Sequence, residues 1–158
     1  MSYPRISLIH PTGNPNSRQA AIALSEVGLL QELITTISYN PNQKFNRLLS
    51  LLPKKLGNYI NHELGRRTWI PPKNVSLRTY PLIEILRLAI VRTGLNGQFG
   101  WTEQRLIDRV YLRLDHLVAK NHLQNLDAVY AYEDGAATTF QAAKEQGILC
   151  LYDLPILF

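Results

Sequence analysis

The sequence predicts a doubly wound α/β fold, in which a mainly parallel sheet of about five strands carries helices on both faces. Two observations lead to this prediction. Short β-branched and aromatic runs alternate with amphipathic segments along the 158 residues, a pattern typical of α/β proteins. The last two strand-like runs, residues 127–132 and 148–153, are almost continuously apolar, as are strands that lie buried on both faces of a parallel sheet.

The first 40 residues predict a strand–helix–strand unit. Residues 5–10 (RISLIH) and 33–40 (LITTISYN) have the β-branched composition of strands. Between them, the turn HPTGNPNSR precedes a helix that we expect Ser17 to cap and Gly28 to end. Two strands joined by one crossover helix are parallel, so this unit sets the direction of the sheet.

The middle of the chain is less regular. Residues 42–68 predict helical pieces interrupted at Pro53 and Gly57. A third strand is expected over residues 75–81, and a helix over residues 82–92 follows it.

The C-terminal third returns to a clear pattern. After a predicted loop at residues 96–101, Thr102 is placed to cap a long helix that runs to about Lys120. A last helix, over residues 135–146, separates the two apolar strands. No linker or internal repeat divides the chain, so residues 1–158 are expected to form a single domain.

The composition excludes several classes of protein. Hydrophobic residues make up 46% and charged residues 18% of the chain, which suits a globular protein. No apolar run reaches the roughly 20 residues needed to span a bilayer, and the N-terminus has no signal-peptide pattern. The single cysteine, Cys150, excludes an internal disulfide and indicates a reducing, cytoplasmic interior.

Positive charge is concentrated in the middle of the chain. Residues 41–120 carry 14 lysines and arginines against 5 aspartates and glutamates, whereas the two flanks together carry 3 against 7. Such a block favours an anionic membrane or another acidic partner. The alternative is that its apolar side packs on the sheet. Nucleic acid is disfavoured because aromatic residues do not interleave with these charges. The expected contact residues are Lys44, Arg47, Lys54, Lys55, Arg66 and Arg67.

Common cofactor motifs are missing. The turn after the first strand contains only Gly13, so it matches neither a dinucleotide-binding nor a P-loop pattern, although its amides and the following helix start could hold a phosphate. The sequence HEL at residues 62–64 lacks the second histidine of a zinc protease, since position 66 is arginine. The loose spacing of Asp115, His116 and His122 makes surface histidines a better interpretation than a metal site.

Two adjacent carboxylates, Glu133 and Asp134, follow the fourth predicted strand and precede a helix. Asp134 is a natural helix N-cap. Glu133 has no such structural role, and a carboxylate at the carboxyl edge of a sheet can act as a general base toward a hydroxyl group.

Two stretches resemble a known family: LIHPTGNPNSRQAAIALSEVGLLQELITTISYN and VYAYEDGAATTFQAAKEQGILCLYDLPI. They look like the N-terminal half of bacterial group 1 glycosyltransferases, which are retaining enzymes with two Rossmann-like domains in the GT-B arrangement. The resemblance extends from about Ile6 to Ile156. Its most specific parts are HPTGN near the start and YEDGA with YDLP near the end.

The resemblance implies roles for the residues that follow the predicted strands at their carboxyl ends. Such a domain binds the saccharide or lipid-linked acceptor, which receives a sugar from a nucleotide-sugar co-substrate; no other cofactor and no metal are expected. Glu133 and Asp134 are then the candidate catalytic residues. The implied substrate-binding residues are His10, Thr12, Gly13, Asn14, Tyr132 and Asp153.

The chain departs from the family because the second, donor-binding domain is absent and the ending DLPILF leaves the family pattern. We therefore expect no activity from this chain alone, and a separate donor-binding half as its partner if the enzyme is split. A truncated remnant and a solitary domain remain open. The alternative function is a non-catalytic module that binds anionic membranes or acidic partners. Either function predicts a cytoplasmic location, the second at the inner face of the membrane.

Overall fold

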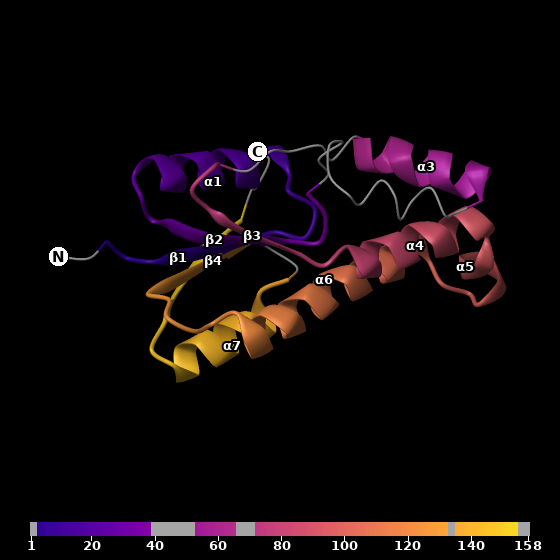
Figure 1. Cartoon of the computed structure of the whole chain (residues 1–158). Coiled ribbons are helices and arrows are strands. Elements are labelled where there is room, and N and C mark those ends of the chain that lie inside the picture. Colours follow the sequence, from indigo (N-terminus) through magenta and orange to yellow (C-terminus); the bar gives the residue numbers. More distant parts are fainter. Residues whose placement is uncertain (1–2, 39–52, 66–71, 133–134, 155–158) are drawn as a thin grey trace.

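A five-stranded sheet forms the centre of the computed structural model, which describes residues 3–38, 53–65, 72–132 and 135–154 (Figure 1). The strand order is β3-β2-β1-β4-β5, and all four pairings are parallel. This confirms the predicted parallel α/β sheet. The strands are β1 (Ile6–Ile9), β2 (Leu30–Thr35), β3 (Ser76–Thr79), β4 (Ala128–Tyr132) and β5 (Leu149–Asp153).

Helices cover both faces of the sheet, as predicted. Helix α1 lies over one face, and helices α6 and α7 lie over the other, while α3, α4 and α5 gather beyond one end of the sheet (Figure 1). The short α5 occupies part of the segment that the sequence predicted as a loop. The described helices are α1 (Pro15–Glu26), α3 (Lys54–Gly65), α4 (Pro81–Thr93), α5 (Leu95–Gln98), α6 (Glu103–Asn121) and α7 (Ala137–Glu145).

The alternation of side chains along β1 divides the core in two. Leu8 points toward α1, where it packs with Ala21, whereas its neighbour Ile9 packs with Leu114 and Val118 of α6 on the opposite face. Successive residues of a strand point to opposite faces, so a strand buried on both sides is mainly apolar. This explains the composition of β1 and β4, although β1 also buries the polar Ser7.

Two predicted boundaries were wrong. Helix α1 begins at Pro15, and its N-cap is Asn14, whose side-chain oxygen accepts the Ser17 amide at 2.8 Å. Ser17 itself is buried in the first turn and donates its hydroxyl to the Asn14 carbonyl. Proline suits the first helical position because its missing N–H has no helical partner there. The second strand begins at Leu30 rather than at residue 33 and ends at Thr35.

The predicted N-cap of the last helix was also wrong. Ala136 occupies that position and offers no side-chain acceptor. The carboxylate of Asp115, one helix away on α6, accepts the amides of Thr138 and Thr139, both at 2.8 Å. These two N–H groups have no partner within the helix, so Asp115 caps α7 from outside it.

The strand order reverses direction between β1 and β4. From β1 the chain moves through β2 to β3 on one side, and it then returns to add β4 and β5 on the other side. In open α/β sheets of this kind, ligands bind outside the carboxyl ends of the strands at the point of reversal. The loops that follow β1 and β4 are therefore the first place to look for a site.

Candidate functional site

His10 and Tyr132 meet at this reversal point. The pairing of β1 with β4 sets Ile9 opposite Ala131, so the next residue of each strand comes to the same carboxyl edge. The two rings stand edge to face, with centroids 5.0 Å apart and planes at 74°. Both residues were predicted to bind substrate, and the fold brings them together.

The His10 imidazole is buried and uncharged. Its Nδ1 accepts the backbone amides of Thr12 at 3.1 Å and Gly13 at 2.8 Å, and these hydrogen bonds assign the ring proton to Nε2. Burial lowers the pKa of His10 to about 4, because the charged imidazolium is poorly solvated there. At neutral pH, His10 is therefore a fixed, neutral N–H donor.

The turn that follows His10 is held on both sides. The Pro11 carbonyl accepts the Thr36 amide at 3.0 Å and the Thr35 hydroxyl at 3.1 Å, both from the end of β2. The Arg18 guanidinium donates to the Gly13 carbonyl at 2.7 Å. Gly13 has a φ of 60°, a conformation that glycine adopts without strain.

These bonds leave the turn poorly suited to hold a phosphate. The amides of Thr12 and Gly13 are directed at His10, and the Ser17 amide is bonded to the Asn14 side chain. Pro15 has no N–H group. A phosphate cradle needs several amides that point at the ligand, and these three amides of the turn are already bonded within it.

Tyr132 offers a second donor. Its side chain is buried, and its hydroxyl makes no hydrogen bond of normal geometry with the described residues, although Tyr130 and Asp153 lie close enough to affect its pKa through hydrogen bonding. The nearest polar groups are engaged with each other, since the Tyr130 hydroxyl donates to Asp153 at 2.8 Å. Burial raises the pKa of Tyr132, with smaller contributions from Tyr130 and Asp153. The phenol therefore keeps its proton at neutral pH.

Asp153 extends the site across a third strand. It is the register partner of Tyr132 in the pairing of β4 with β5, so His10, Tyr132 and Asp153 form a row along the carboxyl edge of three neighbouring strands. The row combines two neutral donors with one carboxylate acceptor. This arrangement suits a neutral ligand rich in hydroxyl groups better than an anion, because the acidic group would repel negative charge.

The structure places the other predicted site residues outside the row of His10, Tyr132 and Asp153 or does not describe them. Gly13 and Asn14 shape and cap the turn, Thr12 is half-buried beside them, and Lys54 and Lys55 are exposed in the first turn of α3. The remaining predicted residues lie outside the described ranges: Lys44, Arg47, Arg66, Arg67, Glu133 and Asp134.

Sequence reasoning missed Tyr130. Its ring centroid lies 5.6 Å from that of Tyr132, and its hydroxyl orients Asp153. The signal was available in the sequence VYAY, because residues two apart in a strand share a face. Two tyrosines on the same face of a buried strand place two hydroxyl groups near one carboxyl edge.

His122 is not the surface histidine that its spacing predicted. Its Nδ1 lies 3.1 Å from Glu32, its Nε2 is hydrogen-bonded to the Tyr80 hydroxyl, and Glu32 also accepts from Arg78 at 3.0 Å. This network ties the end of α6 to β2 and β3. His116, by contrast, is exposed, as expected.

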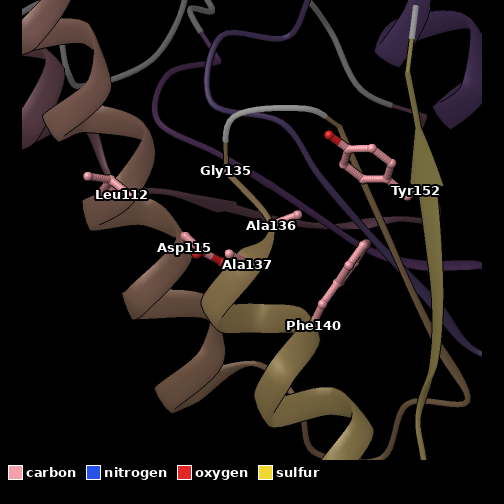
Figure 2. A pocket seen from close by; sticks show the side chains of 7 residues that line it. All are labelled: Leu112, Asp115, Gly135, Ala136, Ala137, Phe140 and Tyr152. Carbon is pink, nitrogen blue, oxygen red and sulfur yellow. The ribbon is translucent and has the colours of Figure 1, made fainter.

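An apolar pocket of about 480 Å³ opens beside α6, α7 and β5 (Figure 2). Phe140 rises into it from α7, and the Tyr152 ring extends into it from β5. Asp115 also borders it, with its carboxylate bonded to the start of α7. The lining residues are Leu112, Asp115, Gly135, Ala136, Ala137, Phe140 and Tyr152.

The described parts of the chain contain no cluster of three or more histidine, cysteine, aspartate or glutamate side chains that could hold a metal ion. Within the same ranges, no helix combines the length and the hydropathy required to cross a membrane. No protein-family model, curated protein or solved structure matches this chain.

Proposed function

We propose that this chain is the acceptor-side domain of a glycosyltransferase, which moves a sugar from a nucleotide-sugar donor to a saccharide or lipid-linked acceptor. The observation that carries the proposal is the row of His10, Tyr132 and Asp153 at the reversal point of the sheet. Its geometry supports the binding of a hydroxyl-rich acceptor, and the resemblance of the sequence supports the reaction.

The chemistry of the row fits a sugar. The Nε2–H of His10 and the O–H of Tyr132 are neutral donors, and Asp153 is an acceptor. A buried hydroxyl without a partner costs free energy, and a ligand hydroxyl would remove that cost.

The proposed reaction divides its chemical roles between an acceptor side and a donor side. Glu133 or Asp134, which follow Tyr132 in the sequence, would act on the acceptor hydroxyl as a general base. A separate donor-binding half would hold the nucleotide sugar and stabilise its diphosphate leaving group. This chain alone is expected to bind acceptors without turnover.

Ligand-observed NMR with a panel of methyl glycosides and disaccharides tests the proposal. We expect weak binding to the wild-type protein, at least a fivefold weaker binding to the Tyr132→Phe variant, and no sugar transfer on addition of nucleotide sugars. Tyr3→Phe, at an exposed tyrosine near the N-terminus, is the matched control. Absence of binding to every saccharide in the panel would overturn the proposed function.

A second candidate function is a module that binds anionic membranes. The observation that favours it is the exposure of Lys54 and Lys55 at the start of α3, together with the exposed Leu82 and Leu86 of the neighbouring α4. Basic side chains and exposed leucines on neighbouring helices suit an anionic lipid surface.

Vesicle sedimentation separates the two functions. A membrane module would bind phosphatidylserine vesicles and lose this binding when Lys54 and Lys55 are changed to glutamate, with the same double charge reversal at the exposed Lys120 and Lys144 as control. Equal binding by both double variants would contradict a specific role for the start of α3.

A further inference from the structure

The outward face of α6 carries a stripe of arginines. Arg105, Arg109 and Arg113 recur every four residues, so they share one face of the helix at intervals of about 6 Å along its axis. All three are exposed, because the opposite face of α6 supplies the residues that are buried in the core. Among the described residues, none of the three takes part in an ion pair. This arginine stripe therefore presents positive charge that the described part of the fold does not neutralise.

Two aromatic rings adjoin the arginine stripe. Phe99 and Trp101 are stacked, with centroids 5.2 Å apart and planes at 29°. The Arg109 guanidinium lies over the Trp101 ring, 4.8 Å from its centroid, and such a contact between a cation and an indole ring is attractive. Phe99 is 62% exposed, so its ring is accessible to a ligand. Stacked rings and positive charge therefore meet at one surface.

The turn between α5 and α6 positions the two rings beyond the sheet, where α6 extends toward α4 and α5 (Figure 1). The Trp101 amide donates to the Asn96 carbonyl at 2.8 Å. Gly100 has a φ of 64°, a left-handed conformation that glycine adopts without strain. Thr102 then caps α6 by accepting the Arg105 amide at 3.2 Å. Both ends of the turn are tied to helices, which holds the rings beside the first arginine of the stripe.

This combination suits a single-stranded nucleic acid. Arginine binds phosphate through charge-assisted hydrogen bonds, and an exposed aromatic ring stacks on a base of any identity. Sequence reasoning disfavoured nucleic acid because aromatic residues did not interleave with the positive charges, but here the fold brings the two kinds of side chain together. Small ligands such as mononucleotides bind in concave pockets, whereas the arginine stripe is the outward face of a helix. An extended ligand that follows the helix fits it better.

An anionic membrane suits this face less well. An interfacial helix needs an apolar face that is free to enter the headgroup region. The apolar residues that recur along α6 are instead buried in the core of the fold: Leu106, Val110, Leu114 and Val118. The exposed Leu112 borders the pocket beside α7. What α6 offers to a partner is therefore charge next to aromatic rings.

We propose that the arginine stripe of α6 and the stacked rings beside it bind single-stranded nucleic acid without base specificity. The arginines pair with phosphates along the strand, and a base stacks on the exposed ring of Phe99. This function goes beyond the proposed transferase reaction and does not rest on it, because the surface shares no residue with the row at the carboxyl edge of the sheet.

Fluorescence anisotropy with a labelled oligothymidylate tests the proposal on the full chain. We expect binding that weakens steeply with salt, because each phosphate contact adds about 0.7 to the slope of log affinity against log salt concentration. Arg105→Gln combined with Arg113→Gln removes two such contacts and should lower the slope by about 1.4. Lys73→Gln combined with Lys144→Gln, at two exposed positions outside α6, is the matched control and should leave the slope unchanged.

The stacking contact has a test of its own. Phe99→Leu keeps an apolar side chain and removes the ring, so the affinity for the oligothymidylate should fall by about fivefold or more. Phe99→Tyr keeps a ring and should retain the affinity. Thermal melting checks that each variant folds.

Several results would overturn the proposal. They include no binding of the oligothymidylate in low salt, an unchanged salt slope in the double arginine variant, and equal affinities of the wild type and Phe99→Leu. Full competition by thymidine monophosphate, at an equal concentration of nucleotide units, would indicate a mononucleotide site instead. Binding to phosphatidylserine vesicles that depends on the two arginines, without binding of the oligothymidylate, would indicate a membrane surface instead.

Discussion

Two histidine–tyrosine pairs in this protein have similar geometry and different surroundings. His10 and Tyr132 have ring centroids 5.0 Å apart with planes at 74°, and His122 and Tyr80 have centroids 5.8 Å apart with planes at 84°. The Tyr80 hydroxyl is bonded to His122, which is bonded to Glu32. The Tyr132 hydroxyl has no such partner among the described residues.

The difference separates a structural network from a candidate site. The pair around His122 completes its own hydrogen bonds and joins three elements of the fold, so it has no need of a ligand. In the pair around His10, the amides of the turn donate to Nδ1. The Nε2–H of His10 and the hydroxyl of Tyr132 are the remaining donors. An unsatisfied buried polar group in a native structure calls for an explanation, and a ligand hydroxyl provides one.

The largest expected loss of stability comes from removing the side chain of His10, and removing that of His122 should cost less. His10→Ala deletes a buried ring and leaves the amides of Thr12 and Gly13 without their acceptor, so we expect a loss of about 3–4 kcal/mol in the free energy of unfolding. His122→Ala leaves Glu32 paired with Arg78, and a loss of about 1–2 kcal/mol is expected. Urea denaturation measures both, and equal losses would contradict the contrast.

The free energy of unfolding should depend strongly on the protonation of His10 at acidic pH. Its pKa is lowered in the folded protein to about 4 from the ordinary value of 6.5, so the unfolded chain binds the proton more readily. Stability should therefore be complete above pH 6.5 and fall by on the order of 3 kcal/mol as the pH drops to 4. In His10→Asn, whose side-chain oxygen can still accept the turn amides, this part of the pH dependence should vanish. The difference between the two urea profiles isolates the contribution of His10, and identical profiles would contradict it.

Removing the charge of Glu32, which belongs to the network around His122, should change the free energy of unfolding by a smaller amount. Glu32→Gln keeps the size of the side chain and weakens its interactions with Arg78 and His122. Because Arg78 is largely exposed, we expect a loss of about 0.5–1 kcal/mol in the free energy of unfolding. The loss should shrink in 1 M salt, where exposed charges are screened. A loss that salt does not change would mean that the pair acts through hydrogen bonding alone.

The sequence predicted the sheet because the sheet depends on local pattern, and it placed the candidate site at one edge of that sheet. Apolar runs at residues 127–132 and 148–153 identified β4 and β5, and the carboxyl ends of parallel strands share one edge. The residues His10, Tyr132 and Asp153 could therefore be grouped before their distances were known.

The sequence could not predict interactions between distant residues. Asp115 caps α7 across 23 positions of sequence, and His122 meets Glu32 across 90. Nor could the sequence reveal that the Thr12 and Gly13 amides are directed at His10 rather than at a ligand. Helix starts were also misjudged at Ser17 and Asp134, because a side chain from another element or an earlier residue supplied the cap.

The most direct test of the central claim is a paired measurement on Tyr132→Phe and Tyr80→Phe, which combines urea denaturation with saccharide titration. We predict that Tyr132→Phe changes the free energy of unfolding by less than about 0.5 kcal/mol and weakens saccharide binding, since its hydroxyl serves the ligand. Tyr80→Phe should cost about 1 kcal/mol and leave binding unchanged. Equal losses of stability in the two variants, with no change in binding for Tyr132→Phe, would contradict the account.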